Sequence, residues 1–338
     1  VIDRPGGSIV PKGIDARGKR SMVLDLKKPE AVAALLKIVA TADVLIEGLR
    51  PGVTERMGVG PDVCHAINPR LIYGRMTGWG QTGPWSQMAG HDLNYIGMTG
   101  VLNAIGKDGQ PPVPPLNMIG DFGGGSMFLV NGILAAIIER AQTGRGNIVD
   151  AAIVDGTHNL MSFVHGMAGV GQWRTKREAN LLDGAAPFYR CYMTADGKFM
   201  AVGCIEPQFF AAMMERLPID REAYGAQHDH AAFAKQHEML EDVFATKTRD
   251  AWEAIFAGTD ACVTPVLDYV EAASHPVNAE RHAVVTDGRW LHPQVAPRLA
   301  TQPLPTHFDI AAKGADYAAI LAEAALSADE ISQLIAAG

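Results

Sequence analysis

Residues 120–126 read Gly-Asp-Phe-Gly-Gly-Gly-Ser and lead directly into an apolar segment, residues 127–138. An acidic residue followed by glycines and an amphipathic run is typical of a helix N-terminus, where free backbone N–H groups and the helix dipole favour negative charge. Consecutive glycines cost backbone entropy and are used where another group approaches the main chain closely. We therefore predict a helix that begins after Asp121, with this residue either a simple cap or part of a ligand site.

Two helix-to-strand steps upstream of this turn predict a parallel sheet. Apolar residues recur at helical spacing in 29–40 and are followed by a short apolar run at 43–47, and a helical stretch at 61–67 is followed by a second run at 71–76. Alternating helices and strands are typical of α/β folds. Both runs end in glycine-bearing loops, at the sheet edge where ligands of such folds usually bind.

A hairpin downstream predicts a second, α+β region. Residues 188–193 and 198–203 are strand-like and are joined by the turn Asp196-Gly197, and helical stretches follow at 207–216, 230–246 and 249–257. We predict a large α/β domain at 1–170, a linker at 171–187, a small α+β domain at 188–275, and a return linker with C-terminal helices at 276–338.

The composition excludes several functional classes. The 338-residue chain is 48% hydrophobic with a net charge of -8, which argues against non-specific nucleic-acid binding. Its four cysteines lie far apart without a CxxC pair, so we expect neither a disulfide framework nor a zinc site, and we expect a cytoplasmic location. No apolar run approaches the ~20 residues that span a bilayer, and the first residues do not form a signal peptide.

Residues 1–28 carry seven Lys and Arg residues against three Asp, a local positive excess in an acidic chain. This excess indicates either a solvated basic face or a pocket for a phosphate-bearing ligand such as a coenzyme.

Three titratable residues follow loops or precede helices. His91 comes after the glycine-rich loop 78–90, Asp121 follows a proline-rich segment, and Glu206 stands just before Pro207, a favoured first helical residue. Structural roles as caps or first-turn charges account for each of them individually. The cluster around His228-Asp229-His230 is interpreted as a solvated face rather than a metal site.

With these residues laid out, the chain resembles the family III CoA-transferase superfamily and, within it, the α-methylacyl-CoA racemases, over essentially its whole length. The segments that carry the resemblance are DVLIEG at 43–48 with RPGV at 50–53, RMTGWGQTGP at 75–84, GHDLNY at 90–95, GDFGGGS at 120–126 and EPQF at 206–209.

The resemblance implies an interlocked homodimer in which each chain has a doubly wound parallel-sheet α/β domain and a smaller α+β domain. The active site then lies between the large domain of one chain and the small domain of its partner. This arrangement brings Glu206 close to His91 and Asp121. Family members begin with another βα unit of about 30 residues that helps to hold coenzyme A. We therefore expect such a unit to be missing before Val1 in this sequence.

The implied activity is an isomerase reaction of lipid metabolism, the racemisation at C2 of 2-methyl-branched acyl-CoA thioesters. His91 and Asp121 would be the two bases, and Glu206 would fix the tautomer of His91. The helix dipole would lower the pKa of Asp121, and nearby amides would stabilise the enolate. No metal or further cofactor is implied, since coenzyme A arrives with the acyl-CoA substrate. Its implied contacts are Arg4, Lys27, Arg50, Arg56, Asp92 and Tyr95.

Two alternatives stay open. In a family III CoA-transferase the residue matching Asp121 attacks the thioester as a nucleophile, but such enzymes lack this histidine and this glutamate. A non-enzymatic acyl-CoA-binding protein would keep only the fold. The sequence does not select the acyl chain, and it indicates neither a nucleic-acid nor a membrane partner.

Overall fold

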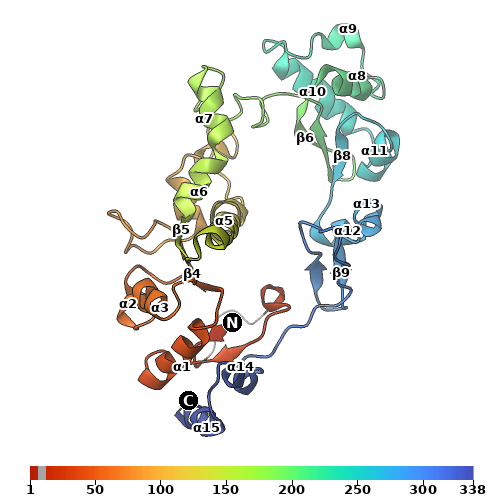
Figure 1. Ribbon diagram of the computed structural model, residues 1–338. Helices are drawn as coiled ribbons and strands as arrows, with labels where there is room; N and C mark the ends of the chain where they lie inside the picture. The colour runs from red at the N-terminus through yellow and green to blue at the C-terminus, as the bar shows by residue number, and fades with distance from the viewer. Residues whose placement is uncertain (7–12, 338) are drawn as a thin grey trace. The chain divides into compact units, whose positions relative to one another are not determined.

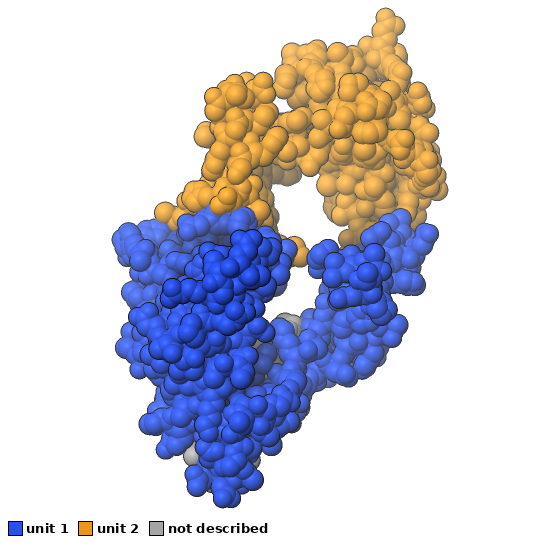
Figure 2. All heavy atoms as spheres, viewed as in Figure 1, with its two compact units in different colours: residues 1–89, 122–156, 269–338 blue, residues 90–121, 157–268 orange. Residues whose placement is uncertain are grey.

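The computed structural model describes residues 1–6 and 13–337 of the chain (Figure 1). The chain forms two compact units, one made of residues 1–89, 122–156 and 269–338 and the other of residues 90–121 and 157–268 (Figure 2). Because each unit is assembled from separate stretches of sequence, the chain passes between them several times. The predicted domain boundaries stay a prediction.

The helices occupy both units. They are α1 Pro29–Val39, α2 Val53–Arg56, α3 Pro61–Ile67, α4 Asp92–Gly97, α5 Met127–Thr143, α6 Ile153–Leu160, α7 Ser162–Gly169, α8 Pro207–Met214, α9 Arg221–Tyr224, α10 Phe233–Phe244, α11 Arg249–Phe256, α12 Tyr269–Ser274, α13 Pro276–Glu280, α14 Tyr317–Glu323 and α15 Ala328–Ala337, with short 3₁₀ turns at Ile14–Ala16 and Leu102–Ala104.

The first unit contains a three-stranded parallel sheet in the order β3-β4-β5. These strands are Val44–Glu47, Ile72–Thr77 and Ile148–Ala152, so the predicted strands and their parallel pairing are confirmed. Helix α5 packs on this sheet, and its residues Leu129 and Ile133 approach Gly74 so closely that a Cβ there would lie 3.1 and 3.3 Å from them. A glycine in the middle strand therefore lets the helix reach the sheet.

Two smaller strand pairs complete this unit. The parallel pair β1-β2 consists of Ile2–Asp3 and Met22–Val23, and the antiparallel pair β9-β10 consists of Val284–Thr286 and Leu291–Pro293. Apolar side chains of α1, α14 and α15 share one core with β2. A capping box precedes α15, in which Glu330 accepts the Ser327 N–H at 2.7 Å and donates its own N–H to the Ser327 hydroxyl at 3.3 Å.

The second unit contains an antiparallel sheet in the order β6-β7-β8. Its strands are Tyr189–Met193, Phe199–Gly203 and Val263–Val266, and the first two form the predicted hairpin. Gly197 in the connecting turn has φ +73°, a conformation that glycine adopts without strain. Helices α8, α10 and α11 supply much of the core that covers this sheet.

The helix that was predicted to begin after Asp121 begins earlier. Residues Met118–Ser126 already wind as a π-helix and continue into α5. The resulting helix, Met118–Thr143, has 26 residues and is long and apolar enough to cross a membrane by length and composition, a test that core helices of soluble proteins also pass. The expectation that no apolar segment reaches this length is therefore wrong, because the glycine-rich residues 120–126 before the predicted helix are themselves helical.

Candidate active site

The side chain of Asp92 connects the start of α4, where His91 lies, to the backbone of Asp121. His91 is the N-cap of α4, and its backbone N–H donates to the Asn94 side-chain oxygen at 3.1 Å. Asp92 is the first residue of that helix, is 5% exposed, and accepts the backbone N–H of Asp121 on Oδ2 at 2.7 Å. The buried carboxylate of Asp92 thus ties the first residue of α4 to the main chain of Asp121.

Glycines near Asp121 are explained by the protein's own packing. A Cβ at Gly120 would lie 2.6 Å from Oδ2 of Asp92, and a Cβ at Gly156 of α6 would lie 1.8 Å from the Gly124 carbonyl oxygen. Asp92 therefore accounts for the glycine at 120, and the close approach of the Gly124 carbonyl accounts for the glycine at 156.

The pKa of Asp121 is raised, in contrast to the depression expected from the helix dipole. Burial is the largest cause and the charge of Asp92 adds to it, while a hydrogen bond from Asn117 and the charge of His91 act in the opposite direction. The Asn117 Nδ2 lies 3.5 Å from Oδ2 of Asp121, at the outer limit of a hydrogen bond. Loss of water and a neighbouring carboxylate both disfavour the ionised form, which raises the pKa of Asp121.

The winding around Asp121 also departs from the expected cap. Asp121 lies in the first turn of a helix whose bonds run from residue i to i+5, a geometry that is rare and frequent at functional sites. Its own amide already donates to Asp92, so it is not one of the donors expected for an enolate oxygen.

Glu206 is the exposed N-cap of α8, as predicted from Pro207 at the next position. Its carbonyl accepts the Phe210 N–H at 3.0 Å, and its charge helps to raise the pKa of the Cys262 thiol, for which burial is the main cause. These contacts involve neither His91 nor Asp121. The expected contact between Glu206 and His91 therefore stays a prediction.

The predicted coenzyme contacts have two kinds of environment. Asp92 is buried and Tyr95 is partly buried, with the Tyr95 hydroxyl donating to the Gly90 carbonyl at 2.5 Å. The four predicted cations, Arg4, Lys27, Arg50 and Arg56, are all exposed. Part of the basic excess in residues 1–28, including Lys12, lies outside the described residues.

The four cations belong to the first unit and stand after its parallel strands. Arg4 follows β1, Lys27 comes four residues after β2, and Arg50 follows β3. Parallel neighbours end at the same edge of a sheet, so Arg4 and Lys27 stand at the same edge of the β1-β2 pair. The carboxyl ends of such strands are the usual ligand side of α/β folds.

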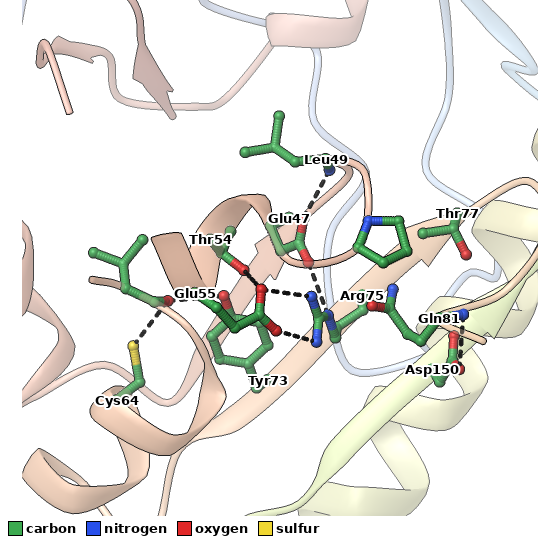
Figure 3. A network of polar contacts seen from close by, with 12 residues as sticks. Glu47, Leu49, Thr54, Glu55, Cys64, Tyr73, Arg75, Thr77, Gln81 and Asp150 are labelled. Atoms are coloured by element: carbon green, nitrogen blue, oxygen red, sulfur yellow. Dashed lines mark hydrogen bonds and ion pairs between the residues drawn. The ribbon is translucent and has the colours of Figure 1, made fainter. Parts of the chain in front are cut away.

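Sequence reasoning missed an ion triad in the first unit, where Arg75 of β4 contacts both Glu47 and Glu55 (Figure 3). A signal was present, because Arg75 interrupts an otherwise apolar strand. A charged residue in such a strand is rarely buried without partners. Within the described part of the chain, no group of three His, Cys, Asp or Glu residues has the arrangement of a metal site.

The parallel sheet β3-β4-β5 with α5 packed on it defines an α/β protein, in which Asp92 links the start of α4, where His91 lies, to the backbone of Asp121. The sequence pattern of CoA-transferase family III matches residues 7–312. The chain belongs to CoA-transferase family III.

Individual relatives refine this placement. Alpha-methylacyl-CoA racemase of Mus musculus is 46% identical over 321 residues, which cover 94% of this chain and 84% of the relative. The protein of the same name from Homo sapiens is 42% identical over 335 residues, 98% of this chain and 87% of the relative. The crystal structure of a CAIB/BAIF family protein from Brucella suis superposes with a TM-score of 0.78 at 25% identity, covering 91% of this chain and 82% of that one.

Proposed function

We propose that this protein is an isomerase that racemises 2-methyl-branched acyl-CoA thioesters at C2. The observation that carries the proposal is the bridge through Asp92, which joins the His91 turn to the Asp121 backbone at 2.7 Å. The bridge ties together the two segments that carry His91 and Asp121, both of which can exchange protons. The names and the high identity of the two mammalian relatives support the same activity.

The reaction needs two groups because inversion at carbon requires that a proton leaves from one face and another arrives from the opposite face. One of His91 and Asp121 removes the proton next to the thioester carbonyl, which leaves an enolate. The other, in its protonated form, then donates a proton to the same carbon. The exchange leaves the substrate formula unchanged, and the reverse reaction uses the two groups in swapped roles.

The raised pKa of Asp121 suits this exchange of roles. An ordinary carboxyl has a pKa about two units below that of an ordinary imidazole, so proton transfers in the two directions would differ in difficulty. Burial and the Asp92 charge raise the pKa of Asp121 and bring its proton affinity closer to that of an imidazole. Pairs of titratable groups tuned by their surroundings are typical of acid–base sites.

The proposal includes a homodimer, for which helix α5 gives support. Its apolar residues Leu129, Ile133 and Ala136 are buried against the sheet. Apolar residues also continue along an exposed face, at Met127, Val130, Leu134 and Ile138. A helix that is apolar on both faces is normally covered on both. A second copy of the chain would cover the exposed face, and sedimentation without detergent tests this assembly against a lone chain or a membrane-bound one.

The remaining parts of the proposal follow the family resemblance. We infer a doubly wound large domain, an interlocked arrangement in which Glu206 of the partner subunit orients His91, and a cytoplasmic enzyme that needs no cofactor beyond the coenzyme A of its substrate. The cations Arg4, Lys27, Arg50 and Arg56 would bind the phosphates or adenine of that coenzyme. Fractionation of cells tests the location, and coenzyme A binding by variants of the four cations tests the contacts.

The experiment that tests the activity starts from a single enantiomer of a 2-methylacyl-CoA in D2O. Deuterium at C2 is followed by NMR together with optical rotation. We expect deuterium incorporation accompanied by loss of optical activity. If folded protein that binds coenzyme A catalyses no exchange, the racemase proposal is wrong.

The same assay separates the transferase alternative, which the family description itself names. In a transferase, the Asp121 carboxylate would attack the thioester carbon and release the coenzyme A thiolate, giving an acyl–aspartyl anhydride. A carboxylate acceptor such as succinate is therefore added to a parallel reaction. A new CoA ester without deuterium at C2 would favour the transferase, and deuterium without a new ester would favour the racemase.

A further inference from the structure

The Glu47–Arg75–Glu55 triad is built from three elements of the first unit (Figure 3). Arg75 Nε donates to Oε1 of Glu47 at 2.9 Å, Nη1 donates to Oε1 of Glu55 at 2.8 Å, and Nη2 lies 3.4 Å from Oε2 of Glu55. Glu47 is the last residue of β3 and stands opposite Arg75 of β4 in the sheet register. Glu55 comes from α2, which follows β3.

Stability alone does not explain this triad. The side chains of Arg75 and Glu47 are only 9% and 7% exposed. Removing two charges from water costs several kcal/mol per ion, and well-packed apolar residues at such positions are often as stabilising. A triad with a buried Arg75–Glu47 pair is better explained by the specific geometry that it imposes on the chain.

The triad fixes the segment 48–56. Glu47 Oε2 accepts the Leu49 backbone N–H at 2.7 Å, and Glu55 anchors α2 to Arg75. The Pro51 carbonyl accepts a hydrogen bond from Gln87 Nε2 at 3.1 Å. The segment is thus held near its start, at its middle and near its end, and two of these ties belong to the triad.

The segment presents two cations to solvent. Arg50 and Arg56 are exposed, and within residues 1–6 and 13–337 neither makes an ion pair or a side-chain hydrogen bond. Arg56 Nη1 lies 3.1 Å from where a Cβ on Gly52 would stand, so its guanidinium folds back over the turn. Two such guanidinium groups on a fixed turn suit a phosphate ester, since arginine is the usual partner of phosphate.

We propose that Arg75 is a positioning residue that, through Glu47 and Glu55, holds Arg50 and Arg56 in place to bind a phosphate group of the acyl-CoA substrate. This inference rests on the proposed function for the identity of the ligand. Fixing a loop before binding lowers the ordering cost of association, which appears as affinity for the phosphate-bearing part and not as a faster chemical step.

For the variant Glu55→Gln, simple charge attraction and positioning of the segment predict opposite changes in coenzyme A affinity. If only Coulomb attraction mattered, removing an acidic charge beside Arg56 would strengthen anion binding. If Glu55 positions the segment, its loss weakens binding. We expect the Kd of the full chain for free coenzyme A, measured by titration calorimetry, to rise about tenfold and the KM for acyl-CoA to rise with it at unchanged kcat. An unchanged or lowered Kd overturns the proposal.

Glu330→Gln is the matched control. Glu330 pairs with Lys37 at 2.7 Å and its side chain is 46% exposed, against 44% for Glu55. The control therefore removes a similarly exposed, ion-paired carboxylate in the same unit, away from the segment 48–56, although its partner Lys37 is 42% exposed against 9% for Arg75. The Kd for coenzyme A should stay at the wild-type value, and an equal rise in this control would overturn the proposal by assigning the effect to general loss of stability.

A second background tests whether the effect passes through the two arginines. In the variant Arg50→Ala/Arg56→Ala, adding Glu55→Gln should change the Kd no further, because the groups that it positions are gone. A further tenfold rise would contradict the proposal. The racemase proposal and the positioning role of Arg75 can fail separately, because C2 exchange tests the first and coenzyme A affinity tests the second.

Absence of coenzyme A binding by the wild-type protein also overturns the inference.

Discussion

Two pairs of acidic residues in this protein have opposite electrostatic environments. Glu47 and Glu55 share the guanidinium of Arg75, whereas Asp92 accepts the backbone N–H of Asp121 and lies close enough for its charge to act on the Asp121 carboxyl. Burial raises the pKa of Glu55, but the hydrogen bond and charge of Arg75, together with hydrogen bonds from the backbone and Thr54, outweigh it, so the net shift is downward. At Asp121 burial and the Asp92 charge act in the same direction and the pKa is raised.

The comparison shows that the surroundings of a carboxyl group decide whether it has a structural role or an acid–base role. A carboxylate held by arginine stays ionised and fixes geometry. A carboxyl beside another acid and partly removed from water releases and accepts its proton nearer neutral pH, which suits acid–base chemistry. The residue types alone do not separate the two cases.

The largest expected effect tests the reactive pair. Asp121→Asn should lower the rate of C2 proton exchange by about 10³-fold, because loss of an acid–base group typically costs 10²–10⁴-fold. His91→Ala should have a comparable effect. The thermal midpoint of Asp121→Asn should be no lower than that of the wild type, since a raised pKa means that ionised Asp121 weakens the fold at neutral pH. Retained exchange would remove Asp121 from the mechanism.

The next effect tests the structural pair. Arg75→Met should destabilise the fold by about 3 kcal/mol, because it leaves buried Glu47 without its cation. The measurement is the denaturant midpoint of the first unfolding transition. Arg75→Lys, which keeps the charge, should recover part of the loss, and a wild-type midpoint for Arg75→Met would show that the triad does not stabilise this unit.

The pH dependence of that loss has a defined sign. The pKa of Glu55 is lowered in the folded chain, so its contribution to stability is present above the pKa of the unfolded state and disappears as pH falls through the folded pKa. The gap between the wild type and Arg75→Met should therefore narrow below about pH 4. A gap that widens toward acid would contradict the assigned pairing.

A smaller effect is expected at Glu206. Glu206→Gln should slow exchange by about tenfold, since a residue that orients His91 assists the base without replacing it. Coenzyme A affinity, measured on the same sample, should be unchanged. An exchange rate equal to that of the wild type would leave Glu206 only its place at the start of α8.

The smallest effect concerns the coupling within the reactive pair. Asp92→Asn removes the charge that helps to raise the pKa of Asp121, while its amide oxygen can still accept the Asp121 N–H. The acidic limb of the kcat/KM profile should therefore move to lower pH. A limb that stays in place would assign the raised pKa to burial alone.

Local features of the fold were predictable from the sequence. Helical spacing placed α1, alternation of helix and strand gave the parallel sheet, and Asp196-Gly197 located the hairpin. The segments that contain His91 and Asp121 were also identifiable from their sequence motifs. These predictions were correct because periodicity and turn formation depend on residues that are neighbours in the sequence.

The start of the long helix was missed for a related reason. Glycines usually weaken helices, so residues 120–126 indicated a break. Contacts from elsewhere, namely Asp92 at Gly120 and α6 at Gly124, instead hold this stretch in a wide helix. Tertiary packing overrode a local preference.

The sequence by itself thus determined the family, the strands, the hairpin and the residues that carry candidate chemistry. Only the tertiary structure decided which carboxylates contact the Arg75 guanidinium and which carboxyl lies near another acid. The contact between Asp121 and Asp92 spans 29 positions and that between Arg75 and Glu47 spans 28. A pKa depends on charges and water within a few ångströms in space, and separations of this length in sequence do not reveal them.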